Sequence, residues 1–227
     1  ESAGSNAIVY FYSTNIQPLF HYDLDSPVSL YTWKNYFIWN DAHKNYLHTK
    51  LHKTPRYIVS EPIYFSDNSL ESIPSLNSEK KILSIFDISP VRKSYYINLG
   101  IFHEYYSFSI IKSFYEDIIN IAEKLDLQIL IKPKRVLNNI HHKGYAKFLS
   151  NLGQNKNILL VNPSISADRL IEKSDLVISL PYTSTAIIAQ YKNISSAFYD
   201  PSAGLKNTNN VNLIQSYEKL EKWIKEQ

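Results

Sequence analysis

The chain has 227 residues, which is enough to bury a full hydrophobic core in one or two domains. No apolar run approaches the ~18 residues that span a bilayer, and we expect no signal peptide. The absence of cysteine excludes disulfides, thiolate metal sites and cysteine nucleophiles. A net charge of +3 is too small to indicate a nucleic-acid partner.

The amino-terminal part of the chain, residues 8–78, predicts a short α/β segment followed by a linker. The predicted strands are the β-rich runs Ile8–Tyr12, Asn35–Trp39 and Arg56–Val59. The predicted helix is Asp41–His52, and the polar linker is Ser66–Lys80. Asn40 or Asp41 is the expected cap of the helix. This part is short for a complete Rossmann-like unit, so we expect a partial acceptor-side domain.

Residues 79–227 alternate strands and helices more regularly. The predicted strands are Ile82–Phe86, Gln128–Ile131, Asn157–Val161, Leu176–Leu180 and Ser195–Tyr199. The predicted helices are Phe102–Leu125, Tyr145–Leu152, Ala167–Lys173, Thr185–Tyr191 and Leu213–Lys225. This alternation predicts an α/β fold, with a Rossmann-like parallel sheet that carries helices on both faces.

The most informative stretch of the chain is 175–190, which predicts a buried strand, a turn at Pro181 and a helix capped by Thr183 or Ser184. A helix that starts just beyond a parallel strand presents free N–H groups and the positive end of its dipole. The five glycines are too dispersed for a G-x-G-x-x-G or Walker loop. We therefore expect this hydroxyl-rich turn to be the phosphate-binding device.

Polar residues follow the other predicted strands as well, and the carboxyl ends of parallel strands are where ligands of α/β sheets bind. The candidates for an anion site are Asp87; Lys132, Lys134 and Arg135; Tyr182, Thr183, Ser184 and Thr185; and Asp200. Each loop also has a plain structural interpretation, as a solvated turn or as a helix cap. Their convergence on one sheet edge favours a phosphate or diphosphate site.

Other groups of polar residues are weaker candidates. Asp23-Leu24-Asp25 has the spacing of a cation-binding pair, but an ordinary acidic loop explains it equally. Glu104 opens the predicted long helix and is a candidate general base, with capping as the alternative. We expect no metal ion.

Four short motifs, in this order and spacing, resemble the bacterial polysaccharide-biosynthesis proteins named for a Pro-Phe-Thr-Ser motif. They are Ile-Phe-Asp-Ile-Ser-Pro at 85–90, Leu-Ile-Lys-Pro-Lys-Arg at 130–135, the stretch 174–186, and Phe-Tyr-Asp-Pro at 198–201. The motif itself is Pro181-Tyr182-Thr183-Ser184, with Tyr in place of Phe. The resemblance runs from about Tyr36 onward.

The layout also resembles the carboxyl-terminal, donor-binding half of GT-B glycosyltransferases, especially bacterial sialyl- and Kdo-transferases. Those enzymes hold the phosphate of a CMP- or CDP-activated donor with a His-Pro loop and a Ser-Ser or Ser-Thr loop. Lys132-Pro133 and Thr183-Ser184 stand at these places, and the histidine is missing. The resemblance thus implies donor binding more strongly than protonation of the leaving group.

The resemblance implies a metal-independent glycosyltransferase, or its donor-binding domain, that builds a surface polysaccharide in the bacterial cytoplasm or at the inner face of the membrane. Its donor would be a nucleotide sugar, with a CMP-activated sugar as one candidate, and its acceptor a glycan or lipid-linked glycan. Asp87 and Glu104 are the candidate catalytic carboxylates. The alternatives are a non-catalytic scaffold module of polysaccharide assembly and a sugar-nucleotide epimerase-like enzyme.

Overall fold

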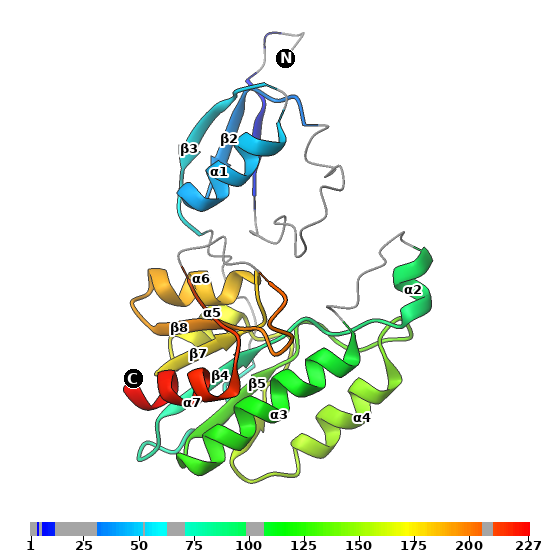
Figure 1. The fold of residues 1–227 in the computed structure, drawn as a ribbon, viewed down its shortest axis with the longest axis vertical. Helices are drawn as coiled ribbons and strands as arrows, with labels where there is room; N and C mark the ends of the chain where they lie inside the picture. Colours follow the sequence, from blue (N-terminus) through cyan, green and yellow to red (C-terminus); the bar gives the residue numbers. More distant parts are fainter. Residues whose placement is uncertain are drawn as a thin grey trace.

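The computed structural model describes residues 4, 6–11, 31–51, 53–62, 71–98, 107–205 and 211–227. Within these residues it contains two parallel β-sheets, one of three strands and one of six (Figure 1). Both sheets carry helices, so the α/β fold class predicted from the sequence is confirmed.

The smaller sheet lies in the amino-terminal part and has the order β1-β2-β3. Its strands are β1 (Ile8–Tyr10), β2 (Asn35–Ile38) and β3 (Arg56–Val59). Helix α1 (Asp41–Lys50) packs against one face through Leu47, which is fully buried. The Asn40 side chain accepts a hydrogen bond from the His43 N–H at 2.9 Å and caps α1, as the sequence predicts.

The larger sheet has the order β6-β5-β4-β7-β8-β9, and all of its strands are parallel. The strands are β4 (Ile82–Phe86), β5 (Gln128–Lys132), β6 (Ile158–Leu160), β7 (Leu176–Ser179), β8 (Ser195–Tyr199) and β9 (Asn212–Ile214). Counted within this sheet alone, the order is 3-2-1-4-5-6, the doubly wound arrangement of dinucleotide-binding folds. The two central strands, β4 and β7, are almost wholly buried because helices cover both faces.

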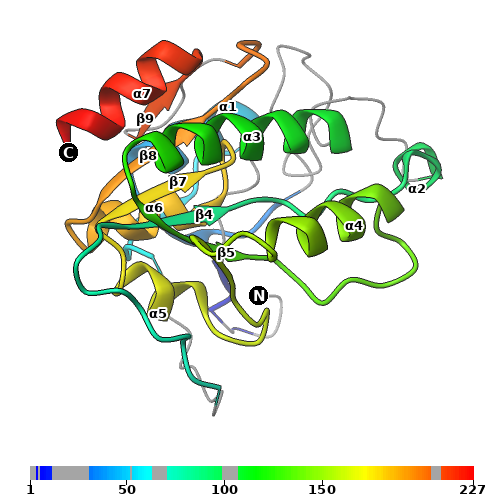
Figure 2. The same cartoon turned by 90° about the horizontal axis from the view of Figure 1, so that it is seen from below.

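Helices cover both faces of the larger sheet (Figures 1 and 2). On one face lie α3 (Phe108–Lys124), α4 (Lys143–Leu152) and α7 (Tyr217–Glu226), and on the other lie α5 (Ala167–Ile171) and α6 (Ser184–Tyr191). Alternate strand residues point to opposite faces. Ile85 therefore packs in the cluster with α3, whereas Phe86 packs with α5.

Trp39 links the two sheets. Its side chain is buried in the core of the larger unit, although the residue directly follows β2 of the smaller sheet. The indole N–H donates to the Phe11 carbonyl at 2.7 Å, and the Tyr191 hydroxyl at the end of α6 donates to the Trp39 carbonyl at 2.9 Å. The carboxyl end of the small sheet thus packs against α6.

The structure differs from the predicted elements in three places. Helix α3 begins at Phe108 rather than Phe102, since the Ser107 side chain caps it. Residues 93–98 form helix α2 (Lys93–Asn98), which the sequence analysis did not predict. Leu213 belongs to strand β9 and not to the closing helix, because Ser216 caps α7 and that helix starts one residue later.

Candidate functional site

The candidate site lies at the carboxyl edge of the larger sheet, where the strand order reverses between β4 and β7. Phe86, the last residue of β4, pairs with Lys132 on one side and with Ser179 on the other. With strands ~4.8 Å apart, the Cα atoms of Lys132 and Ser179 are roughly 10 Å apart. The loops that follow β5 and β7 therefore flank Asp87, which directly follows β4.

The loop after β7, Leu180–Thr183, is called the motif loop here. The Thr183 N–H donates to the Leu180 carbonyl at 3.2 Å, and Tyr182 has a φ of 62°. Proline at the second position and positive φ at the third are the features of a type II turn, in which glycine or asparagine is usual at the third. The strained backbone is compensated by the buried Tyr182 ring, which contacts Phe198 edge to face at 5.9 Å.

The hydroxyls of this region form a short chain at the start of α6. Those of Ser179 and Thr185 lie 2.7 Å apart and share a hydrogen bond, and the Thr183 hydroxyl donates to the Leu180 carbonyl at 2.8 Å. Thr183 occupies the cap position, but its side chain makes no cap hydrogen bond. The Thr183 hydroxyl therefore does not act as the capping acceptor that is usual at this position.

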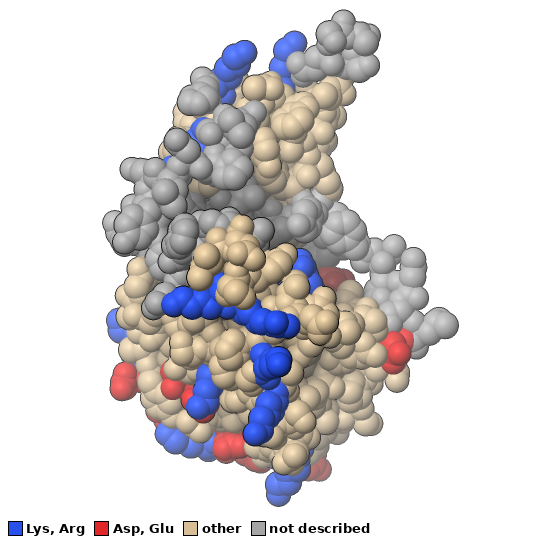
Figure 3. Space-filling model, turned by 90° about the vertical axis from the view of Figure 1, so that its right-hand side faces the viewer, with Lys and Arg blue, Asp and Glu red and all other residues tan. Residues whose placement is uncertain are grey.

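The loop after β5, residues 133–141, is called the basic loop here. Lys132 is 8% exposed and ends β5, whereas Lys134 and Arg135 are exposed. Desolvation, followed by repulsion from Arg135, lowers the pKa of Lys134, and the charge of Asp87 acts in the opposite direction. Figure 3 faces the carboxyl edge and shows Lys and Arg side chains gathered on it below the small sheet. This edge is therefore suited to an anion.

Asp87 lies beneath these loops in a cluster of buried polar side chains. It is 4% exposed, and the Tyr145 hydroxyl of α4 donates to its Oδ2 at 2.5 Å. Burial raises the pKa of Asp87 to about 6, against the lowering effects of Tyr145, Tyr115 and Lys134. Its Oδ1, the Ser89 hydroxyl and the Tyr115 hydroxyl are buried without a hydrogen bond of normal geometry.

The basic loop is joined to the loop after β4 by backbone hydrogen bonds. The Arg92 N–H donates to the Ile140 carbonyl and the His142 N–H donates to the Pro90 carbonyl, each at 2.9 Å. Val91 and His141 form an antiparallel bridge between them. Since the two loops follow β4 and β5, these bonds hold the basic loop against the loop that begins at Asp87.

Asp200 has a structural explanation that involves no ligand. Its side chain is fully buried and accepts hydrogen bonds from the Ser202 N–H and hydroxyl, the Leu205 N–H and the Gln215 amide, at 2.6 to 3.1 Å. These four donors fix residues 200–205 after β8 and join them to Gln215 after β9. Among the residues predicted for the site, Asp200 is thus the one whose carboxylate is already saturated by the loop around it.

Two predicted features cannot be placed. Glu104 and the pair Asp23 and Asp25 lie outside the described residues. Within the described ranges, no three His, Asp or Glu side chains gather as metal ligands, and no helix is long and apolar enough to cross a membrane.

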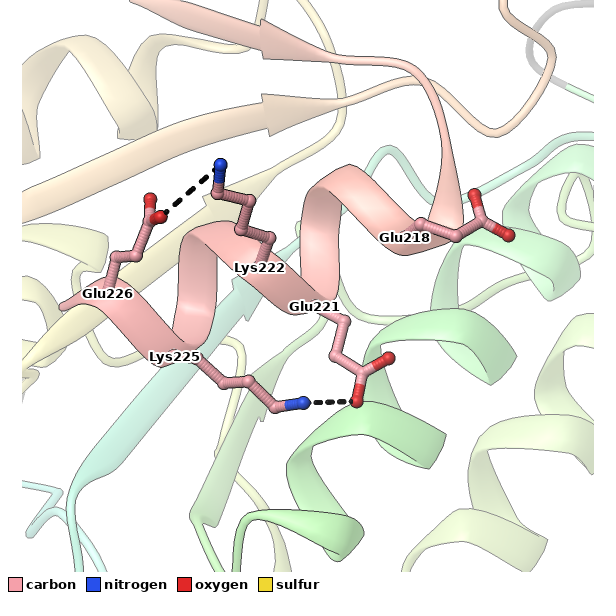
Figure 4. Close-up of a pocket in the computed structure, with 5 residues that line it drawn as sticks. All are labelled: Glu218, Glu221, Lys222, Lys225 and Glu226. Carbon is pink, nitrogen blue, oxygen red and sulfur yellow. Dashed lines mark hydrogen bonds and ion pairs between the residues drawn. The ribbon is translucent and has the colours of Figure 1, made fainter.

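A shallow hollow elsewhere on the surface is lined by one helix, α7 (Figure 4). Its charged side chains pair along the helix, with Lys225 at 2.8 Å from Glu221 and Lys222 at 3.7 Å from Glu226. Such exposed pairs between neighbouring turns are ordinary helix surface. The hollow therefore does not compete with the carboxyl edge as a candidate site.

The strand order and the polar loops at its switch point define a doubly wound α/β protein with a basic carboxyl edge. The chain belongs to the family of polysaccharide biosynthesis PFTS motif proteins, whose family model matches residues 1–224. The motif loop and Ser184 carry the sequence that names the family, with Tyr182 at the Phe position.

No curated protein matches the chain. One solved structure with detectable similarity is that of KpsC, a beta Kdo 2,4 transferase from Thermosulfurimonas dismutans. The match has 11% sequence identity and a TM-score of 0.36, and it covers 95% of this chain and 62% of that structure. The chain thus spans less than two thirds of the length of that structure.

Proposed function

We propose that the protein is a glycosyltransferase, or the donor-binding part of one, that acts in the biosynthesis of a surface polysaccharide such as capsule. Membership of the PFTS family supports the polysaccharide role. The observation that carries the transferase proposal is the pairing of Phe86 with both Lys132 and Ser179. It places cations and hydroxyls on the two sides of one switch point, where α/β proteins bind nucleotides.

In this proposal the two loops hold the phosphate of a nucleotide sugar. Lys134 and Arg135 neutralise its charge, and Lys132 contributes from the end of β5. The first turn of α6 donates N–H groups, with Ser184 and Thr185 adding hydroxyls, as charge develops on the leaving phosphate. Fixed cations supply the charge compensation that a metal ion gives in other transferases, so we propose a GT-B-type, metal-independent reaction.

The acceptor and the surroundings follow from the same proposal. A glycan or lipid-linked glycan would approach from the side of the small sheet, and the reaction would take place in the cytoplasm or at the inner face of the membrane. A nucleotide sugar, with CMP as one candidate activating group, is the substrate, and no further cofactor is proposed.

Binding of nucleotides tests the proposal directly. We expect one of CMP, CDP, UDP and GDP to raise the melting temperature, because a ligand at a hundredfold excess over Kd stabilises a protein by about 2.7 kcal/mol. Lys134→Ala and Ser184→Ala should each weaken that binding about tenfold in calorimetry. Lys156→Ala and Ser150→Ala make the same chemical changes at exposed positions away from the loops and serve as controls.

Two outcomes would refute the proposal. If no nucleotide binds at millimolar concentration, the motif loop is only a helix start and a scaffold role is favoured. If a nucleotide binds equally well to wild type, Lys134→Ala and Ser184→Ala, the protein binds it elsewhere.

A further inference from the structure

Two neighbouring segments, residues 88–98 and 133–152, form a basic lobe beside the candidate site. The antiparallel bridge between Val91 and His141 joins them, together with the backbone hydrogen bonds from Arg92 to Ile140 and from His142 to Pro90. Neither segment contains Asp or Glu. All six Lys and Arg side chains of the two segments are exposed, namely Arg92, Lys93, Lys134, Arg135, Lys143 and Lys147. The basic lobe therefore presents a single sign of charge.

Helix α2 belongs to this lobe and offers its side chains to the outside. It has six residues, and the five side chains of it that the structure describes are all exposed. Helices this short are marginal in water, because most helical stability in proteins comes from the packing of one face. In both ribbon views α2 lies at the side of the molecule, apart from the helices that cover the larger sheet (Figures 1 and 2). The described side chains of α2 are thus available to a surface outside the chain.

Large apolar side chains stand among the cations of the basic lobe. Tyr95 and Ile97 of α2 are 38% and 50% exposed. Val136 of the basic loop is 73% exposed, the highest fraction among the large apolar side chains that the structure describes. One exposed apolar side chain is ordinary, but three on a lobe without acidic residues combine the two features of surfaces that bind the membrane interface.

An anionic lipid bilayer is the partner that uses both kinds of side chain. Its headgroups attract each Lys or Arg that comes close to the surface, and its boundary between headgroups and acyl chains takes up apolar side chains. Tyrosine also suits this boundary, because its ring is apolar and its hydroxyl polar. A dissolved polyanion such as an acidic glycan would engage the cations but would leave Ile97 and Val136 in water.

We propose that the basic lobe docks on an anionic bilayer, with Ile97 and Val136 entering the interface and the cations other than Lys134 and Arg135 facing the headgroups. The docking itself does not depend on nucleotide binding. Its consequence deepens the proposed function and rests on it. Because the basic loop also borders the candidate site, the docked protein holds the carboxyl edge of the larger sheet at the lipid surface, where a lipid-linked glycan acceptor would lie.

Sedimentation with vesicles tests the docking. The protein should bind vesicles of phosphatidylcholine and phosphatidylglycerol much more tightly than vesicles of phosphatidylcholine alone. Salt at ~1 M should weaken this binding strongly, because the Debye length falls from ~10 Å at 0.1 M to ~3 Å. Lys93→Gln should weaken it about fivefold through the lost attraction to the headgroups. Ile97→Ser and Val136→Ser should each weaken it about fivefold through the lost apolar contact.

Matched control variants make the same changes outside the basic lobe. Ile8→Ser replaces an isoleucine of the small sheet that is also 50% exposed. Lys156→Gln replaces an exposed lysine that precedes β6, at the opposite edge of the larger sheet. Both controls should bind the anionic vesicles as the wild type does. Lys93→Gln and Ile97→Ser should keep the wild-type affinity for a dissolved nucleotide, since neither residue belongs to the proposed nucleotide site.

Four outcomes would overturn the docking or the function separately. If the anionic vesicles are not bound, the docking fails and a protein partner is favoured for the lobe, while the nucleotide site stands. If Ile97→Ser and Val136→Ser bind as the wild type does, the cations act alone and the insertion is refuted. Equal losses in Ile8→Ser and Lys156→Gln would refute the choice of surface. If the vesicles are bound but no nucleotide is, the docking stands and the proposed function fails.

Discussion

The left-handed backbone of Tyr182 gives a sharp test of the motif loop. A non-glycine residue in this region costs about 1–2 kcal/mol, and the φ of 62° is seen at a residue whose ring is 3% exposed. Truncation of the ring to alanine removes the buried contacts but keeps the strain, whereas truncation to glycine removes both. A comparison of Tyr182→Ala with Tyr182→Gly therefore isolates the backbone.

The matched control is Phe198, which contacts the Tyr182 ring and lies in the extended strand β8. Either ring truncated to alanine should cost about 3–5 kcal/mol. In the strand, glycine should be less stable than alanine by about 0.5–1 kcal/mol, because it loses more backbone entropy. At position 182 glycine also relieves the backbone strain, which should cancel or reverse that order. Relative to alanine, glycine should therefore be more favourable for stability at position 182 than at position 198, by about 1–2 kcal/mol.

Urea denaturation of the four variants measures these differences as shifts in the transition midpoint at constant slope. The reasoning is refuted if glycine is less stable than alanine by the same amount at both positions. Tyr182→Phe, which restores the residue that names the family, keeps the ring. It should retain most of the stability, losing about 0.5–1.5 kcal/mol at most from the hydroxyl.

Three further predictions concern the rest of the fold. Asp200→Ala should cost about 2–4 kcal/mol in urea denaturation, because buried donors such as the Leu205 N–H lose their acceptor, and nucleotide affinity measured on the folded fraction should not change. Trp39→Ala should cost about 3–5 kcal/mol and expose the smaller sheet to limited proteolysis, since the indole that bonds Phe11 also packs in the larger core. Burial lowers the pKa of His43 to about 4, below its ordinary 6.5, so between these pH values the unfolded chain binds one more proton than the folded chain. The free energy of unfolding, measured in urea, should therefore fall by roughly 3 kcal/mol as pH drops from 6.5 to 4. His43→Gln should remove this dependence on pH.

The strands of the larger sheet were predictable because their physical signal is local. Strand β7 begins with three apolar residues, Leu-Val-Ile, and Pro181 follows soon after its end, and a buried central strand of a parallel sheet has this composition. Ser166 could likewise be recognised as a cap, and its side chain accepts from the Arg169 N–H at 3.3 Å. Such elements depend on neighbours within one turn or one strand.

Strand β9 was missed because two patterns compete in the same residues. Leu213 has the helical spacing to Tyr217 and Leu220, so periodicity alone extends the helix backward. Ser216 decides against it, because its side chain accepts from the Lys219 N–H and fixes the first turn. The pairing of Tyr199 with Ile214 then makes a strand of the preceding residues, and no local signal announces that pairing.

The environment of Asp87 depends on contacts that sequence spacing cannot reveal. Tyr145 is 58 positions away, on a helix whose rotation about its own axis decides whether the hydroxyl reaches the carboxylate. From the sequence alone, Asp87 is predicted to be an accessible carboxylate in the loop after a strand, and it is therefore a candidate catalytic group. Its burial instead encloses the carboxylate in the core, where it is held by the Tyr145 hydroxyl.

The motif loop and the basic loop, which lie on the two sides of the switch point, differ in how their polar groups are held. The motif loop is held in a strained turn by the Tyr182 ring, so its donors are fixed before a ligand arrives. The basic loop is also fixed in its backbone, but its cations Lys134 and Arg135 are long, exposed side chains. In the proposed function, a rigid donor side and a cation side made of long, adaptable side chains suit a site that binds a nucleotide phosphate and also releases it, because the cations can leave the phosphate without any change in the backbone.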